Sequence, residues 1–539
     1  MIGSDVDRAA DSDVVPEELD LRRVIRDRAA RHGDRKCLIA SNRTVTWRRL
    51  YERSSALAQA LLASGVQTGD RVLYIGKNDI ATLETVFAVA LSNAVFAAVN
   101  WRLSASEISE IIAHAKPKVV ITESDYAQAA STQMVVPADA FAAGQLVVLV
   151  ADKSATSYAS FLSSGQPVDP CLEFDRDSVA LQVYTSGTTG LPKGAVFTHR
   201  AIAAANNAAK QLALDEDAVA LVAMPMFHCS GLSFALAALA HGGTCVIAAS
   251  ARPDAIVADI AAHGVTTTML VPTVLPGILD AAAAGVGALA SLKRLAYVGA
   301  PIDRELLNRA LAVLGPDRLV NAYGASEIIA ATMLLPQAHL DERRRFSVGR
   351  ALPGVTIKIV AEDGNTVGDN VTGEILIRGP SNTLGYADAP EHTRVAFTED
   401  GYFRTGDGGY LDDGWLYLAD RIKDMIITGG ENVYSLEVES VLAGCPGVLE
   451  VAVIGLASAK WGETVHAVVV SDGRLTARDI IDFATKRLAS YKCPKAVSFV
   501  DSLPRTATGK VRKHELREMI AAASAATTGL PAASTTAPA

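Results

Sequence analysis

The sequence is poor in cysteine and has none of the cysteine patterns that hold metals. Its 539 residues include six cysteines, with no C-x-x-C pair and no histidine pairing at metal-ligand spacing. Neither a structural zinc site nor a disulfide framework is therefore expected. We expect small buried side chains in a reducing compartment at all six positions, which are Cys37, Cys171, Cys229, Cys245, Cys445 and Cys493.

The chain also lacks an excess of positive charge and an apolar leader. Its 50 basic and 59 acidic residues give a formal net charge of −9, which offers no overall attraction to nucleic acid or anionic lipid. The first seven residues are acidic and have no apolar core, so we expect no signal peptide. The expected protein is cytoplasmic and binds no nucleic acid.

A transmembrane helix is not expected either. Residues 218–240 carry no formal charge over the length of a membrane span. Pro225, His228, Ser230 and Gly231 interrupt this window, and we interpret it as a strand, a loop and a helix inside a core. The composition leaves open a weak peripheral contact with a membrane, and it leaves open a homodimer.

The length and the hydrophobic pattern predict an α/β protein of two to four domains. Strand-like runs alternate with helix-like segments, which is typical of parallel sheets covered by helices. The predicted strands are 72–75, 95–99, 119–122, 179–183, 244–248, 266–271 and 294–298, and the predicted helices are 80–91, 106–115, 232–240, 255–262, 274–284 and 303–314.

The pattern changes after residue 346. Short β-like runs at 356–360, 373–378, 401–405 and 415–418 predict a small β subdomain over about 346–420, within an N-terminal domain of residues 19–420. A compact α+β domain is predicted over 425–520. Residues 1–18, which are acidic, and 521–539, which are rich in Ala, Ser, Thr and Pro, are predicted to be disordered tails.

Residues 184–194 have the composition of a phosphate-binding loop. They contain four Ser or Thr hydroxyls, three glycines and Lys193, and a helix-like segment follows from Thr198. Glycines let successive N–H groups turn toward one anion, hydroxyls add donors, and the lysine supplies a charge. The spacing is not that of a Walker A loop. From composition alone, an ordinary loop is the alternative.

This string closely resembles the signature of the adenylate-forming (ANL) superfamily, which contains acyl-CoA synthetases, firefly luciferase and peptide-synthetase adenylation domains. Other strings resemble the same superfamily in the same order and together cover nearly the whole chain. The resemblance implies ATP, Mg2+ and coenzyme A as cofactor and co-substrates. It also implies that the ATP phosphates contact Thr185, Ser186, Gly187, Thr188, Thr189, Gly190 and Lys193.

Residues 224–231 resemble the segment whose histidine, here His228, lines and gates the acid pocket. Without the resemblance, His228 would be interpreted as a core histidine. The resemblance and the small or apolar character of nearby residues predict an acid pocket made of His228, Cys229, Gly231, Ala325, Ile328, Ala330 and Ala331.

Two further strings resemble the adenine and α-phosphate sites. The turn of Gly299, Ala300 and Pro301 would hold the adenine face. In residues 321–327, Tyr323 would pack against adenine, Ser326 would bond the α-phosphate, and Glu327 would hold magnesium together with Thr185. The neighbours assigned to the same site are Asn321, Ala322, Gly324 and Ala325. Taken alone, this second string would be an ordinary turn.

The C-terminal third resembles the ribose site and the hinge. Asp407 would bind the ribose hydroxyls, because a carboxylate accepts two hydrogen bonds. Arg421 would reach the ribose or the α-phosphate, and Lys423 would be the pivot of a hinge over 421–424 about which the C-terminal domain moves. Lys510 resembles the lysine that enters the active site during adenylation, although a lone lysine near a C-terminus is usually solvated surface.

The same resemblance assigns residues to coenzyme A. Gly429 and Gly430 would line a tunnel for the pantetheine arm, and a β-turn is their alternative interpretation. Positions resembling those that hold the CoA nucleotide are Trp461, Tyr491, Lys492 and Lys495. Cys493 stands where some members of the superfamily have a basic residue.

The implied reaction accounts for these groups. A carboxylate becomes a good electrophile when it attacks the α-phosphorus of ATP and releases pyrophosphate, and a thiol then attacks the acyl-adenylate. Three groups would stabilise the negative charge of the first transition state: Lys193, Lys510, and the Mg2+ ion held at Glu327. His228 would border the reacting acid. A hinged domain would present Lys510 first and the thiol tunnel second.

The leading hypothesis is therefore an acyl-CoA synthetase acting on an apolar carboxylic acid, from fatty to aromatic, alicyclic or steroid-derived. The alternative is an enzyme that loads a carrier protein. An amino-acid substrate is disfavoured, because His228 follows Phe227 where amino-acid-activating members carry an acidic residue. A luciferase-like oxidase is a third, weaker option.

Overall fold

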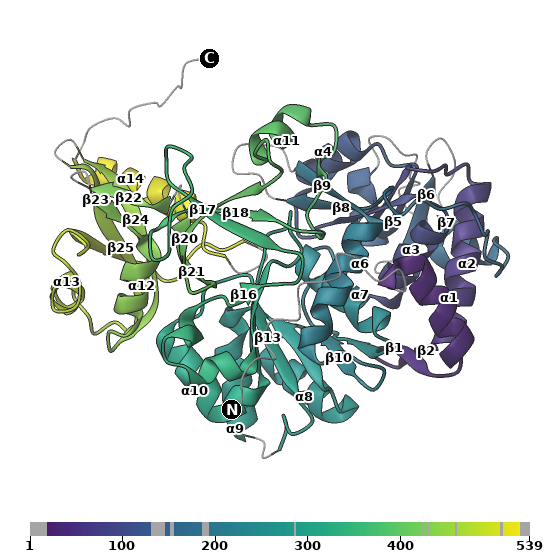
Figure 1. Cartoon of the computed structure of the whole chain (residues 1–539), viewed down its shortest axis with the longest axis horizontal. Coiled ribbons are helices and arrows are strands. Elements are labelled where there is room, and N and C mark those ends of the chain that lie inside the picture. Colours follow the sequence, from purple (N-terminus) through teal and green to yellow (C-terminus); the bar gives the residue numbers. More distant parts are fainter. Residues whose placement is uncertain are drawn as a thin grey trace, which may run out of the picture.

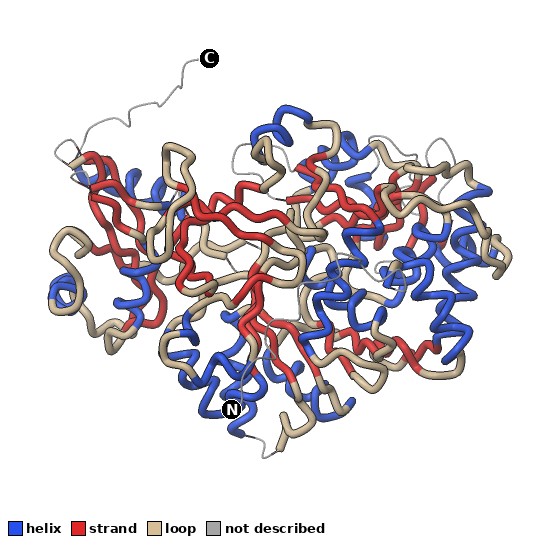
Figure 2. Tube along the Cα trace, in the orientation of Figure 1, coloured by secondary structure: helices blue, strands red, loops and turns tan. Residues whose placement is uncertain are grey.

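The chain forms three β-sheets with helices around and between them (Figures 1 and 2). The computed structural model describes residues 19–130, 146–150, 156–185, 193–284, 287–421, 424–428, 431–458, 461–506 and 510–528. The predicted class is confirmed: a large N-terminal domain of helix-covered sheets with a β-rich part is followed by a small α+β C-terminal domain.

The largest sheet has thirteen strands in the order β17-β18-β20-β21-β16-β15-β14-β13-β12-β10-β11-β1-β2. Strands β1 and β10 to β14 pair in parallel, whereas β15 to β18, β20 and β21 pair antiparallel and form a β-rich part. The strand bounds are β1 Lys36–Ala40, β2 Arg43–Thr46, β10 Val219–Val222, β11 Thr244–Ile247, β12 Thr267–Leu270, β13 Arg294–Val298, β14 Leu319–Tyr323, β15 Thr332–Leu334, β16 Arg350–Ala351, β17 Thr356–Val360, β18 Gly373–Arg378, β20 Phe403–Asp412 and β21 Trp415–Arg421.

The second sheet has eight strands in the order β19-β9-β8-β4-β3-β5-β6-β7. Its centre, β8-β4-β3-β5, is parallel, as helix crossovers require. The bounds are β3 Arg71–Ile75, β4 Val95–Val99, β5 Val119–Glu123, β6 Leu146–Val150, β7 Thr156–Ser157, β8 Val179–Thr185, β9 Lys193–Thr198 and β19 Gly385–Tyr386.

Helices fill the space between these two sheets and cover their outer faces. One core cluster joins strands of both sheets to α1, α2, α3, α6 and α7. All twelve residues of α3 are buried, so this mostly apolar helix lies inside the domain. The bounds are α1 Leu21–His32, α2 Trp47–Ala63, α3 Ile80–Leu91, α4 Ala105–Ala115, α5 Tyr158–Ser163, α6 His199–Ala208, α7 Cys229–Ala240, α8 Pro253–His263, α9 Leu275–Ala284, α10 Arg304–Leu314 and α11 Pro390–Ala396.

The small C-terminal domain is built on a five-stranded sheet. Helices α12 and α13 pack on one face around Val438, and α14 packs on the other through Leu516. Figure 1 shows this domain beside β17, β18, β20 and β21, at the opposite end of the molecule from α1 and α2. The bounds are β22 Ile426–Thr428, β23 Glu431–Val433, β24 Val448–Ser458, β25 Gly462–Ser471, β26 Ala496–Phe499, α12 Ser435–Ala443, α13 Ala477–Thr485 and α14 Lys513–Thr528.

Three sequence predictions need correction. Strand β9 was missed, so the phosphate-loop string joins two strands of a hairpin and not a strand and a helix. Helix α14 extends to Thr528, where disorder from 521 was predicted, because its alanines favour helix. Cys171 is exposed, since it lies in a surface loop with φ of 50°, whereas the other five cysteines are buried as predicted.

The uncharged window 218–240 contains β10, a loop and α7, as predicted. Among the helices of the described ranges, none has both the length and the hydropathy to cross a membrane. The sequence-predicted tail 1–18, and residues 529–539 of the second tail, lie outside the described residues.

Candidate active site

Strands β13 and β14 bring two of the predicted nucleotide segments together. The two strands are parallel, with Val298 paired to Ala322, so their carboxyl ends lie at the same edge of the sheet. Gly299 follows β13 with φ of 81°, a conformation that glycine adopts without strain, and Tyr323 ends β14. Open α/β sheets bind ligands outside such carboxyl ends.

Tyr323 and Asp407 meet at this edge. The Tyr323 hydroxyl donates a 2.7 Å hydrogen bond to Oδ2 of Asp407 in β20. Asp407 is also the register partner of Arg421 in β21, which brings the backbone of Arg421 to the same place. The residues assigned to adenine, ribose and α-phosphate thus converge, although the side chain of Arg421 lies outside the described residues. The intervening Ala325 and Ser326 are half-buried.

Glu327 lies near the hairpin that carries the phosphate loop. Its Oε1 accepts a 2.7 Å hydrogen bond from the hydroxyl of Tyr386 in β19, and Nζ of Lys193 lies 5.5 Å from the centroid of the Tyr386 ring. Thr185 is the register partner of Lys193 across β8 and β9. Residues Ser186, Gly187, Thr188, Thr189 and Gly190 lie outside the described ranges.

Cys229 is the first residue of α7 and His228 precedes it, and charges from two other parts of the chain contribute to the pKa values of both side chains. Burial, with a smaller contribution from the positive charge of Lys510, lowers the pKa of His228 to about 4. Burial and then the negative charge of Glu327 raise the pKa of Cys229 to about 12. The side chains of His228 and Cys229 are therefore both neutral at pH 7.

The loop before His228 is held by a residue that sequence reasoning missed. Asn78 donates a 2.8 Å hydrogen bond from Nδ2 to the Met224 carbonyl and accepts one of 2.7 Å at Oδ1 from the Met226 N–H. The loop backbone passes so close to α7 that residue 231 must be glycine, because a Cβ there would lie 2.3 Å from the Pro225 carbonyl oxygen. No pattern in a single sequence marks Asn78 for this contact.

The predicted acid-pocket residues fall into two groups. Cys229 is buried in the core between the two large sheets, with Ala330 packed at the edge of the same cluster. Ile328 and Ala331 are fully buried in a different cluster around Tyr323, inside the β-rich part. In this arrangement the second group supports Tyr323 more than it lines an open pocket.

Among residues assigned to coenzyme A, two aromatics are accessible. Trp461 is 47% exposed and Tyr491 is 37% exposed. Lys492 lies 2.7 Å from both carboxylate oxygens of Glu437, and Lys495 donates to the Ser490 carbonyl. The Lys492 charge is therefore compensated in this arrangement. Lys423, Gly429 and Gly430 lie outside the described residues.

The donor set fits magnesium. No group of three or more His, Cys, Asp or Glu side chains within the described part of the chain could hold an ion alone. Mg2+ usually takes one or two carboxylates and completes its shell with phosphates and water. Glu327, next to Lys193 and the hairpin, provides such a carboxylate.

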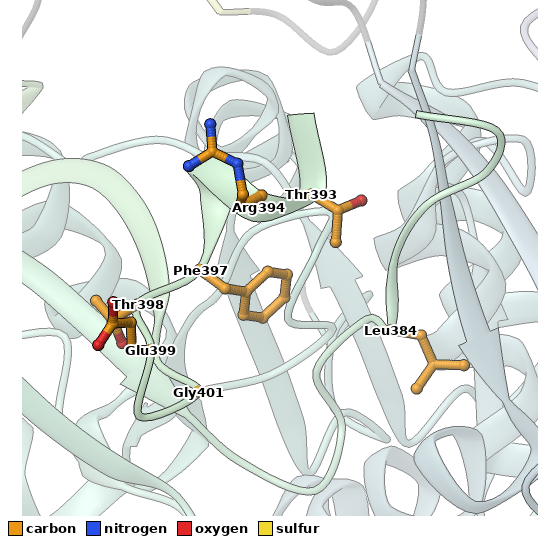
Figure 3. Close-up of a pocket in the computed structure, with 7 residues that line it drawn as sticks. All are labelled: Leu384, Thr393, Arg394, Phe397, Thr398, Glu399 and Gly401. Atoms are coloured by element: carbon orange, nitrogen blue, oxygen red, sulfur yellow. The ribbon is translucent and has the colours of Figure 1, made fainter. Parts of the chain in front are cut away.

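Two open cavities lie beside α11. One, of about 330 Å3, is lined by Lys193, Tyr386, Glu391, His392, Val395 and Ala396. The other, of about 320 Å3, is shown in Figure 3 with Phe397 between Leu384 and the segment from Thr398 to Gly401. The first gives open space next to Lys193 and Tyr386.

Comparison with known proteins identifies the family. Residues 25–387 match the AMP-binding enzyme family, and residues 437–510 match the AMP-binding enzyme C-terminal domain. The chain is 36% identical over 500 residues to a feruloyl-CoA synthase of Amycolatopsis, covering 91% of this chain and 95% of that protein. It is 38% identical over 474 residues to an indoleacetate–CoA ligase of Aromatoleum aromaticum, covering 86% and 91%.

A third relative is named for an acyl carrier protein, and not for coenzyme A, as the acceptor. It is the fatty acid–[acyl-carrier-protein] ligase ScoC of Streptomyces coeruleorubidus, 34% identical over 493 residues, covering 89% of this chain and 92% of that protein.

Solved structures agree over nearly the whole chain. ATP-bound MatB from Rhodopseudomonas palustris superimposes with a TM-score of 0.84 at 28% identity, covering 93% of this chain and 98% of that chain. Apo MatB has a TM-score of 0.73 at 29% identity with the same coverage. The arrangement described here is thus more similar to the ATP-bound form. This chain belongs to the AMP-binding enzyme family and is an AMP-forming acid–thiol ligase.

Proposed function

We propose that this enzyme uses ATP to convert an apolar carboxylic acid to its acyl-adenylate and transfers the acyl group to coenzyme A, giving acyl-CoA, AMP and pyrophosphate. One observation carries the proposal. The hydrogen-bonded pair of Tyr323 and Asp407 lies at the carboxyl end of β14, and Tyr386 joins Glu327 of the following loop to the hairpin of Lys193. A nucleotide pair, a metal-holding carboxylate and a lysine brought together in this way suit an acid attacking a phosphate.

Each group has a distinct task in this proposal. Mg2+, when bound at Glu327, would neutralise charge on the ATP phosphates. Lys510 and Lys193 would stabilise the oxygens that gain negative charge during attack on the α-phosphorus. Tyr323 and Asp407 would hold the adenosine, and their mutual hydrogen bond fixes both before the nucleotide binds. His228, kept neutral by burial, would border the acid without drawing its carboxylate into an ion pair.

The surroundings of His228 support an apolar acid. Met226, Phe227 and Cys229 are all at least nine-tenths buried, and Cys229 is un-ionised. Two relatives are named for aromatic acids, ferulate and indoleacetate, and one for a fatty acid. We therefore propose an aromatic or aliphatic acid whose body carries no charge.

The experiment is an acid panel read by pyrophosphate release, followed by thioester formation with coenzyme A or with a phosphopantetheinylated carrier protein. The proposal predicts that uncharged aromatic or fatty acids release pyrophosphate and that coenzyme A accepts the acyl group. If only the carrier protein accepts the acyl group rapidly, the acceptor thiol is the carrier protein and not coenzyme A. Activity only with dicarboxylic or amino acids would contradict the apolar pocket.

A further inference from the structure

We propose that Tyr386 is a positioning residue for the metal carboxylate: its hydroxyl holds one oxygen of Glu327 so that the other faces the magnesium and ATP phosphates. This inference rests on the proposed metal role of Glu327. It goes beyond that role by assigning a function to a tyrosine that none of the sequence motifs above singles out.

The hydrogen bond between Tyr386 and Glu327 has the direction that this role requires, with the tyrosine as the donor. The Tyr386 hydroxyl donates to Oε1 of Glu327 at 2.7 Å, while Oε2 accepts no hydrogen bond from the side chains that the structure describes. The tyrosine hydroxyl is thus the donor, and one carboxylate oxygen is left for a cation.

The backbone around Tyr386 joins the glutamate loop to the phosphate hairpin. The Thr383 N–H bonds the Glu327 carbonyl at 2.8 Å, and the Ala387 N–H bonds the Gly194 carbonyl at 2.8 Å. Between them, Tyr386 is the register partner of Ala195 in β9. One short strand therefore fixes the distance between Glu327 and the base of the phosphate loop.

Helix α11 holds this strand from the other side. The Tyr386 N–H donates a 2.9 Å hydrogen bond to Oγ1 of Thr393, a residue that lines the cavity of Figure 3. Gly385 has φ of 134°, and a Cβ there would lie 2.4 Å from Cγ2 of Thr393. The tyrosine is therefore anchored by its backbone, and its hydroxyl can be removed without loosening β19.

The neighbourhood suits a phosphate-bound cation. Nζ of Lys193 lies 5.5 Å from the Tyr386 ring centroid, so the ring borders both the lysine and the carboxylate. The open cavity of about 330 Å3 beside Lys193 and Tyr386 provides space for phosphate groups there.

The test is Tyr386→Phe, which keeps the ring and removes only the hydroxyl. Two quantities are measured: the Mg2+ concentration for half-maximal ATP–pyrophosphate exchange, and the Kd of Mn2+, by electron paramagnetic resonance, in the presence of α,β-methylene-ATP. Removing a residue that orients a metal ligand typically weakens metal affinity about tenfold to a hundredfold, and we expect both values to rise by that factor. The melting temperature should stay within a few degrees of wild type.

Two matched variants separate the possible failures. Tyr417→Phe removes a hydroxyl that bonds the Arg343 carbonyl on the surface, and it should leave the Mn2+ Kd unchanged. Glu327→Gln should weaken Mn2+ binding at least as much as Tyr386→Phe. If Glu327→Gln has no effect on Mn2+, the proposed metal role itself is wrong. If Glu327→Gln weakens Mn2+ and Tyr386→Phe does not, or changes only stability, the positioning role is overturned.

Discussion

The hydroxyl of Tyr323 and the carboxylate of Asp407 are joined by a hydrogen bond of 2.7 Å across 84 residues of sequence. Tyr323 ends a strand that continues the parallel part of the large sheet, and Asp407 lies in the antiparallel β-rich part. The bond therefore ties the two halves of the nucleotide site, so that adenine and ribose would meet groups already in position.

The variant Tyr323→Phe tests the role of this hydrogen bond. A hydrogen bond to a charged group contributes about 1.5–3 kcal/mol, so losing it should raise the KM for ATP by about tenfold. The value of kcat should change less, because the bond orients the nucleotide and not the reacting atoms. Steady-state kinetics at saturating acid measure both constants, and Tyr417→Phe is the control for hydroxyl loss elsewhere. An unchanged KM for ATP would mean that Asp407 keeps its position without Tyr323.

Lys510→Ala should separate the two half-reactions. Losing one charge that stabilises the transition state should slow ATP–pyrophosphate exchange by about a hundredfold or more. Thioester formation from pre-made acyl-adenylate should be spared, because that step needs the thiol and not the lysine. The exposed Lys486→Ala serves as a charge-matched control. Equal loss in both half-reactions would contradict the role assigned to Lys510.

Gly231→Ala should be harmful although Gly231 lies in α7. Alanine normally stabilises a helix by up to about 1 kcal/mol relative to glycine. Here the new Cβ would lie 2.3 Å from the Pro225 oxygen and 2.8 Å from the Met224 oxygen, both backbone atoms. Overpacking of this kind costs about 1–3 kcal/mol and exceeds the helix gain.

The displaced loop precedes His228, so the KM for the acid should rise together with the loss of stability. Urea unfolding and acid titrations measure these effects. Gly368→Ala is the control, because nothing lies within 4 Å of a Cβ at that exposed position. Equal stability of the two variants would show that the loop before His228 yields easily.

His199 should make the folded state sensitive to acid. Burial, and then the positive charge of Arg22, lower the pKa of His199 to about 3 from an ordinary 6.5. Between those values the unfolded chain binds a proton that the folded chain does not, so the free energy of unfolding falls as pH falls. This one group contributes a slope of about 1.4 kcal/mol per pH unit within that window.

His199→Phe should reduce this slope between pH 6.5 and 4. The Nδ1 atom has no hydrogen-bond partner in the described part of the chain, and a phenyl ring keeps the edge-on contact with Phe174 at 4.7 Å. Urea unfolding at several pH values measures the slope, and the exposed His392→Gln is the control. The pKa values of His228 and His339 are also lowered, to about 4, so these two residues should keep part of the pH dependence of the unfolding free energy in the variant.

Much of the architecture follows from the sequence pattern. Helix 80–91 and strands 95–99 and 294–298 occupy the residues predicted for them, because the lengths of these apolar runs, twelve residues against five, distinguish a helix from a strand. Strand β9 was missed, since its residues follow a glycine- and threonine-rich string and its partner β19 is only two residues long. Pairing between segments far apart in sequence leaves little periodic signal.

The site shows the same division. Tyr323, Asp407, Glu327 and Lys510 lie in strings whose order predicts a common site, and the structure joins Tyr323 to Asp407 by a hydrogen bond. Asn78 acts through two hydrogen bonds, and the Tyr386 hydroxyl through one, to loops that only the tertiary fold brings near them. A single sequence holds no pattern for such contacts.

The pairing of β19 with β9 has a consequence for synthesis of the chain. Thr383 and Val196, which share a hydrogen bond, are 187 residues apart, and Thr244 bonds the Lys36 carbonyl across 208 residues. Until residue 386 leaves the ribosome, β9 pairs only with β8, and its other edge, next to the phosphate loop, stays open. Contacts of such long separation form late and slowly, and open strand edges favour aggregation. A nascent chain that ends before β19 should therefore contain the β8–β9 hairpin with its phosphate-loop string, yet lack the strand that covers the outer edge of β9.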